Sequence, residues 1–81
     1  MDREEGALIN YYEVLSVAED ATSAEIGVAL ERYRDSMTRQ LNRPRTMQSA
    51  RYALENIVPA IQRHLLSSEK ARREYDAMLA D

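Results

Sequence analysis

Two stretches of apolar residues recur at helical spacing, and a short connection that contains Pro44 joins them. Intervals of three and four residues place side chains on one face of an α-helix. The apolar positions are Ile26, Ala29, Leu30, Tyr33, Met37 and Leu41 in the first stretch, and Met47, Ala50, Leu54, Val58, Ile61 and Leu65 in the second. Two helices of similar length with only residues 42–46 between them predict an antiparallel helical hairpin.

Local signals predict where the first two helices begin. Asn10 is followed three residues later by Glu13, and Thr22 is followed three residues later by Glu25. Both pairs match the capping box, in which the two side chains satisfy backbone N–H groups of the first helical turn. We therefore expect a first helix of under two turns after Asn10 and a long second helix after Thr22.

Prolines and serines predict the remaining boundaries. Pro44 disfavours the helical conformation for Arg43, so the second helix should end before it. Pro59 removes one hydrogen bond from the third helix, but the apolar stripe continues in phase, so we expect a bend within one helix. Ser67 and Ser68 should end that helix and cap a fourth. The apolar side of the fourth helix carries Ala71, Tyr75, Met78 and Leu79. The predicted class is all-α with four helices.

The residue inventory argues against an enzyme. The chain has no cysteine, and its single histidine, His64, has no second metal-binding side chain nearby in the sequence. We therefore expect His64 to lie on the surface of the third helix. The paired acids Glu4 with Glu5 and Glu19 with Asp20 fall in terminal or turn segments, where no pocket would shift their pKa for acid–base chemistry. No glycine-rich phosphate loop is present. We expect neither catalysis nor a cofactor or metal.

The ends of the chain lead to expectations about its location. No apolar run approaches the roughly 20 residues that span a bilayer. The acidic start "MDREEG" is the opposite of the basic start of a signal peptide. We expect a flexible segment over residues 1–7, a helical domain over residues 8–81, no membrane contact and a cytoplasmic location. The abrupt end "AMLAD" suggests a piece of a longer chain.

Residues 10–17, "NYYEVLSV", and residues 65–76, "LLSSEKARREYD", form two motifs. Together they resemble the J-domain family. Residues 10–17 read "NYYEVLSV" and are followed by an acidic turn ending in "DAT", where the family usually reads "DYYEVLGV" and then "DAS". Residues 65–76 read "LLSSEKARREYD", where the family closes with "LSDPEKRAAYD". The resemblance extends over residues 8–78. It implies a J-domain-like four-helix fold with a central antiparallel hairpin.

The tripeptide on which the family's activity depends is missing. Counted from "YYEVL", the His-Pro-Asp of the family falls on Thr38, Arg39 and Gln40, and no His-Pro-Asp occurs anywhere in the chain. In the family this motif engages the ATPase domain and linker of a DnaK-type heat-shock chaperone and promotes ATP hydrolysis. Losing its charge-assisted pair in an interface costs about 2–5 kcal/mol. We therefore expect loss of the stimulating activity.

The exposed face of the second helix also departs from the family pattern. Active J-domains carry many lysines and arginines there. The corresponding positions hold Gly27, Val28, Glu31 and Asp35, with only Arg32 and Arg34 basic nearby. Val28 and Tyr52 lie off the apolar stripes and should be exposed. The candidate partner-binding residues are Thr38, Arg39, Gln40, Arg43 and Arg45 at the hairpin tip, and Val28, Arg32 and Arg34 along the second helix.

The charges are strongly polarised along the chain. Residues 2–20 contain six acids and one arginine, whereas residues 36–54 contain four arginines and no acid. Such a distribution favours a charged partner, although a solvated arginine-rich turn would look the same.

These observations predict a degenerate J-domain-like protein–protein interaction module, related to chaperones but unable to stimulate a DnaK-type ATPase. Its partner would be a DnaK-type chaperone, another J-domain or a client protein. One alternative is an active DnaJ-type co-chaperone that binds a DnaK-type chaperone despite lacking His-Pro-Asp. A second alternative, which we rank last, is a basic helical hairpin that binds nucleic acid.

Overall fold

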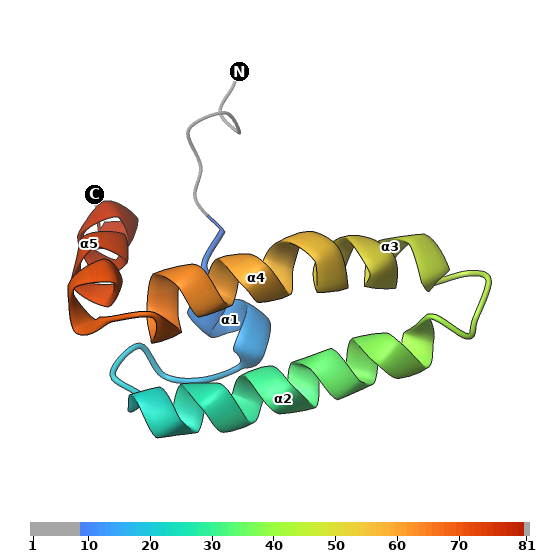
Figure 1. The fold of residues 1–81 in the computed structure, drawn as a ribbon, viewed down its shortest axis with the longest axis horizontal. Coiled ribbons are helices and arrows are strands. Elements are labelled where there is room, and N and C mark those ends of the chain that lie inside the picture. The colour runs from blue at the N-terminus through green and yellow to red at the C-terminus, as the bar shows by residue number, and fades with distance from the viewer. Residues whose placement is uncertain (1–8, 81) are drawn as a thin grey trace, which may run out of the picture.

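The computed structural model describes residues 9–80, and every regular element within them is a helix (Figure 1). Helix α1 spans Tyr11–Leu15, α2 spans Ser23–Gln40 and α5 spans Glu69–Ala80. Between α2 and α5, four segments follow one another without a break: α3 (Met47–Tyr52), η2 (Ala53–Ile57), α4 (Val58–Ile61) and η3 (Gln62–Leu66). We call residues 47–66 the composite helix. The all-helical class with four helices is thus confirmed, whereas the expected flexible segment 1–7 lies outside the described residues.

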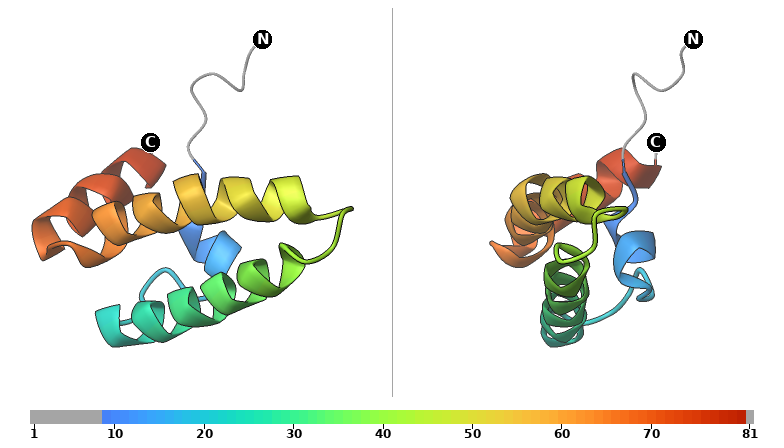
Figure 2. Two further views of the ribbon diagram at one scale, coloured as in Figure 1. Left: turned by 45° about the vertical axis from the view of Figure 1, so that its right-hand side comes forward. Right: turned by 90° about the vertical axis from the view of Figure 1, so that its right-hand side faces the viewer.

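Helix α2 and the composite helix lie side by side and run in opposite directions, as Figures 1 and 2 show. Residues 41–46 connect them at one end of the molecule. Helix α1 packs against α2, and α5 follows the composite helix at the end away from the connection (Figure 1). The connection is therefore the tip of a helical hairpin, and the two short helices gather near its open end.

The core is concentrated at this open end. The largest fully buried side chains come from all four helices, and they are Tyr12, Tyr75, Ile26, Ile61 and Leu65. Each buried aliphatic side chain contributes roughly 1.5–3 kcal/mol through removal of apolar area from water. On α2 only Ile26 and Leu30 are buried, and the stripe residues closer to the tip are half-buried. The tip therefore keeps part of its apolar surface accessible.

Two predicted helix starts are confirmed. Thr22 and Glu25 form a complete capping box, with bonds of 2.9 and 3.1 Å between each side chain and the other residue's N–H group. The Asn10 side chain accepts hydrogen bonds from the N–H groups of Tyr12 and Glu13. The cap on α1 is thus made by Asn10, and the expected return bond from the Glu13 side chain is not among the bonds of the described residues.

Helix α1 ends in an unusual backbone conformation at Ser16. This residue has φ 60° and ψ 45°, in the left-handed region, and it is the only non-glycine residue of the described range with positive φ. Its N–H group donates to the carbonyl of Glu13, which closes the last turn. A residue with a Cβ atom pays a steric cost in this region that glycine does not.

The composite helix continues through Pro59 as predicted, but the irregularity takes the form of π-helical turns. The N–H group of Val58 bonds to the carbonyl of Ala53, five residues earlier. A π turn widens the helix, which relieves the clash between a proline ring and the carbonyl four residues before it. The helix ends before Ser68, whose hydroxyl group accepts from the N–H group of Ala71 at 3.0 Å and caps α5 as expected. None of the described helices combines the length and apolar character needed to cross a membrane.

Candidate functional site

Thr38, Arg39 and Gln40, which the resemblance aligns with His-Pro-Asp, lie in the last turn of α2 and not in the connection. The Thr38 hydroxyl group donates to the carbonyl of Arg34 at 2.9 Å, and the Gln40 amide donates to the Ser36 hydroxyl group at 3.4 Å. These bonds tie Thr38 and Gln40 back onto their own helix. Arg39 is exposed. Of the three, Arg39 is therefore the side chain most available to a partner.

Hydrogen bonds to the backbone carbonyl of Gln40 hold the connection in place. The Gln40 carbonyl accepts from the hydroxyl group of Thr46 at 2.8 Å and from the N–H group of Arg43 at 3.2 Å. The N–H group of Thr46 donates to the carbonyl of Arg43 at 3.1 Å. The side chains of Arg43 and Arg45 are exposed. An ordered turn thus presents both predicted arginines to solvent.

The basic character of the tip is not balanced locally. The arginines of residues 36–54 are all exposed, and they are Arg39, Arg43, Arg45 and Arg51. The described residues form ion pairs within 4.0 Å only on α5, where Lys70 faces Glu74 and Arg73 faces Glu69. Surface ion pairs of this kind contribute little to stability. The four arginines of the tip are therefore exposed and form no ion pair within 4.0 Å among the described residues.

The structure brings Val28 and Arg32 together and separates Arg34 from them. Val28, 55% exposed, and Arg32 line a groove of about 410 Å³ beside α1. The other groove residues include Val14, Val17 and Tyr33, which sequence analysis did not assign to a surface. Arg34 is half-buried, and its Nε atom is buried without a hydrogen-bond partner among the described residues. The predicted second-helix surface thus reduces to the Val28–Arg32 side of α2.

A second groove, of about 280 Å³, lies at the hairpin tip. It is lined by Leu41, Met47, Arg51, Leu54 and Glu55. Sequence analysis placed the three apolar members on the core stripes, but they are only half-buried. The sequence contains one signal for this groove. Residues 47, 51 and 54 lie four and three positions apart, so Arg51 shares a helix face with Met47 and Leu54. We call this the tip groove.

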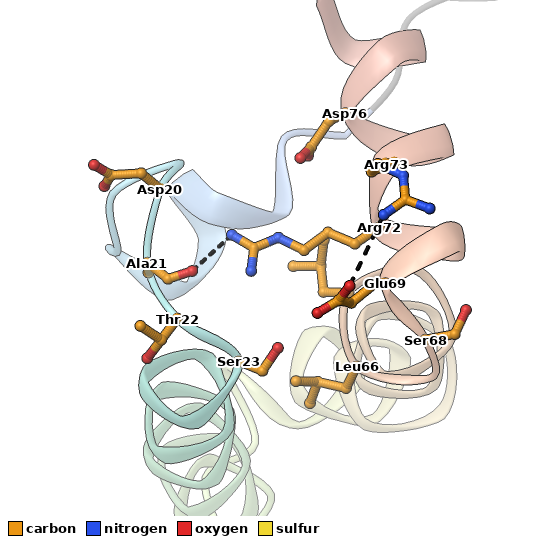
Figure 3. Close-up of a pocket in the computed structure, with 11 residues that line it drawn as sticks. Asp20, Ala21, Thr22, Ser23, Leu66, Ser68, Glu69, Arg72, Arg73 and Asp76 are labelled. Carbon is orange, nitrogen blue, oxygen red and sulfur yellow. Dashed lines mark hydrogen bonds and ion pairs between the residues drawn. The ribbon is translucent and has the colours of Figure 1, made fainter.

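A third hollow, of about 630 Å³, lies between the start of α2 and α5 (Figure 3). The Arg72 side chain extends across it and donates to the carbonyls of Ala21 at 2.7 Å and Glu19 at 3.1 Å. Its Nε atom also donates to the Tyr12 hydroxyl group at 3.1 Å, and its guanidinium group lies 5.5 Å from the centre of the Tyr12 ring. Because these contacts are internal, Arg72 serves to hold the turn before α2 against α5.

Tyrosine hydroxyl groups complete this attachment. Tyr12 donates to the carboxylate of Asp76, and Tyr75 donates to the carbonyl of Ile9. Burial raises the pKa of Tyr12 and of Tyr75, and the bond to Asp76 raises the pKa of Tyr12 further. Both groups therefore remain neutral donors at neutral pH.

His64 belongs to the same aromatic cluster. Sequence analysis assigned it to the helix surface, but it is half-buried, and its ring centre lies 5.4 Å from that of Tyr75 and 6.0 Å from that of Tyr11. The surface assignment was wrong because the positions of α1 and α5 were not visible in the helical pattern of the third helix. The described residues hold no group of three side chains suited to a metal ion. His64 is thus a packing residue.

The fold and its surfaces define a small all-helical hairpin with a basic tip, an apolar groove at that tip and a groove of mixed polarity beside α1. No family model matches the chain, and no curated protein or solved structure gives a significant match.

Proposed function

We propose that this chain is a degenerate J-domain-like module that binds a protein partner through its hairpin and does not stimulate a DnaK-type ATPase. The observation that carries the proposal is the character of residues 38–40. They continue α2, place the neutral amide of Gln40 where the family has its carboxylate, and expose the neighbouring Arg39 to solvent. An interface built to receive an aspartate would lose a charge-assisted bond there and gain a repulsion.

The contacts between the two motifs that carry the resemblance support the J-domain-like part of the proposal. Tyr12 and Tyr11 belong to "YYEVL", and Tyr75 and Asp76 belong to "REYD". The Tyr12 hydroxyl group bonds to Asp76, and the Tyr75 hydroxyl group accepts from the N–H group of Tyr11 at 3.0 Å. Motifs about sixty residues apart therefore act as one packing unit, as expected if both belong to a single domain pattern.

The surface of α2 supports the loss of stimulation independently. Its exposed groove side combines Val28 and Arg32 with the acid Glu25. Such a mixed surface gives little long-range attraction to an acidic chaperone face. It fits a contact that depends on shape and apolar area.

A single-turnover ATPase assay with the DnaK-type chaperone of the host tests the proposal. We expect a hydrolysis rate within twofold of the basal rate when the chain is in excess. A J-domain with an intact His-Pro-Asp motif, measured in the same way, is the positive control and should accelerate hydrolysis. A clear acceleration by this chain would overturn the proposal and favour the active co-chaperone.

The same assay can show whether the chain competes with an intact J-domain, and which of its surfaces makes the contact. We expect excess chain to slow the reaction stimulated by the intact J-domain if it binds either component. Arg39→Ala and Arg43→Ala variants should weaken this effect if the tip is the contact, and Arg63→Ala, an exposed arginine of the composite helix far from the tip, serves as the matched control.

A further inference from the structure

We propose that the tip groove binds an acidic segment of a partner protein and takes up one apolar side chain of that segment. This deepens the proposed interaction role and rests on it, since it names a site and the chemistry of its occupant. The site lies between the end of α2 and the first two turns of the composite helix. Its lining includes none of residues 38–40 and none of the residues that line the Val28–Arg32 groove.

The tip groove has an apolar floor formed from both arms of the hairpin. Met47 and Leu54 share one face of the composite helix, and Leu41 comes from the end of α2. All three are half-buried. A volume of about 280 Å³ is below the roughly 300–1,000 Å³ of sites that enclose a small molecule. It suits a single anchoring side chain.

The packing of the tip explains why this apolar surface remains accessible. Close to the tip, the composite helix buries the small residues Ala50 and Ala53. Alanines allow close approach but leave the longer side chains of Met47 and Leu54 at the edge of the contact. The large core residues lie toward the other end of the hairpin. The tip groove is thus a consequence of how the two helices meet.

The charge around the groove selects an acidic occupant. Arg51 lies on the same helix face as Met47 and Leu54, and Arg43 and Arg45 belong to the adjoining connection. Residues 36–54 contain no acid, and Glu55 is the single carboxylate that lines the groove. These three arginines would raise both the rate of association with a negatively charged partner and the affinity for it.

The apolar floor favours a protein over a nucleic acid. Arginines attract phosphates as well as carboxylates, but a phosphate backbone has no apolar group to fill the space between Leu41, Met47 and Leu54. An acidic segment with one leucine-like side chain satisfies both features. Tyr52, 58% exposed, follows Arg51, and tyrosine and arginine are among the residue types most enriched in binding hot spots.

Fluorescence anisotropy with three labelled probes tests the inference. The first probe is a peptide of aspartates and glutamates around a central leucine, the second has glycine in place of that leucine, and the third is an oligothymidylate of equal charge. We expect the leucine peptide to bind about tenfold more tightly than the glycine peptide, the factor expected from burying one such side chain. The affinity of the leucine peptide should decrease when the salt concentration is raised from about 50 to about 200 mM, because salt screens the Coulombic attraction.

Two variants locate the site. We expect Arg51→Glu to weaken binding of the leucine peptide by more than about tenfold, because it places a like charge inside the groove. The matched control Arg63→Glu reverses an exposed arginine on the same helix away from the tip and should change binding by less than twofold. Helical content and the unfolding midpoint of both variants confirm that they fold.

Three results would overturn the inference: no binding of either peptide at low salt up to about 1 mM, equal affinity for the leucine and glycine peptides, or tighter binding of the oligothymidylate than of both peptides. The last result would assign the tip to nucleic acid. Neither the chaperone nor ATP takes part in these measurements. ATPase stimulation would therefore overturn the proposed function and leave the groove standing, and failed peptide binding would do the reverse.

Discussion

The hydroxyl group of Tyr75 accepts a hydrogen bond from the backbone N–H group of Tyr11 at 3.0 Å, although the two residues are 64 positions apart. The same hydroxyl group donates to the carbonyl of Ile9. One side chain of α5 therefore satisfies two backbone groups where the chain enters α1. The rings of Tyr11 and Tyr75 are also stacked, with centres 5.3 Å apart. This contact joins the two ends of the domain.

Replacing Tyr75 with Phe tests the contribution of this hydroxyl group. Tyr75→Phe keeps the ring but leaves the Tyr11 N–H group without its partner, which should lower the free energy of unfolding by about 1–3 kcal/mol. Urea denaturation monitored by circular dichroism measures the change. Tyr52→Phe removes a hydroxyl group from an exposed tyrosine and should stay within about 0.5 kcal/mol of the parent. Equal stability of all three proteins would contradict the proposed role.

Removing the Arg72 side chain should lower the free energy of unfolding far more than removing the side chain of its neighbour Arg73. Arg72→Leu removes the donors to the Ala21 and Glu19 carbonyls and to the Tyr12 hydroxyl group. We expect a loss of about 2–4 kcal/mol in the free energy of unfolding. Arg73→Leu removes only an exposed pair with Glu69 and should cost less than about 1 kcal/mol.

The substitution Arg72→Lys refines the test. A lysine side chain at this position would carry the charge without the planar fork that reaches several acceptors, so this variant should recover only part of the stability. Full recovery would show that the charge, and not the set of hydrogen bonds, holds the turn against α5.

Ser16 offers a stabilising substitution. Because its φ of 60° lies in the left-handed region, Ser16→Gly should raise the free energy of unfolding by about 1 kcal/mol. Ser16→Ala retains the Cβ atom and should give no such gain. Thermal unfolding of the three proteins measures the difference. A glycine variant no more stable than the alanine variant would argue against a strained C-cap.

Stability should fall in alkaline solution because of the buried tyrosines. Burial raises the pKa of Tyr12, Tyr33 and Tyr75 above the ordinary value of 10.0. Below that value these groups are protonated in both the folded and the unfolded chain, so their contribution is complete. As the pH rises further, the unfolded chain loses the protons first, and stability decreases until the folded groups titrate as well. Urea midpoints at about pH 8 and about pH 11 should show this decrease.

Tyr33→Phe isolates the effect, because the Tyr33 hydroxyl group forms no hydrogen bond among the described residues and its pKa is raised by burial alone. We expect this variant to resemble the parent at about pH 8 and to lose less stability at about pH 11. An increase in the stability of the parent protein as the pH is raised beyond about 10 would contradict the prediction.

Much of the candidate surface followed from residue order. Exposure of Val28 and Tyr52 was expected from their places off the apolar stripes and is confirmed. The basic tip was expected from arginines without nearby acids. Two assignments needed the structure: Met78, placed on the apolar side of α5, is 48% exposed, and Arg34 turns away from the groove that Val28 and Arg32 share.

Residue order alone determined the helical class, the caps at Asn10, Thr22 and Ser68, and the end of α2 ahead of Pro44. These features depend on residues within four positions of one another, which are neighbours in any compact form of the chain. The attachment of Arg72 to the turn before α2, the aromatic cluster around His64 and the tip groove were decided by the tertiary structure. Each joins groups from different helices, so its geometry follows from how the helices pack and cannot be inferred from periodicity.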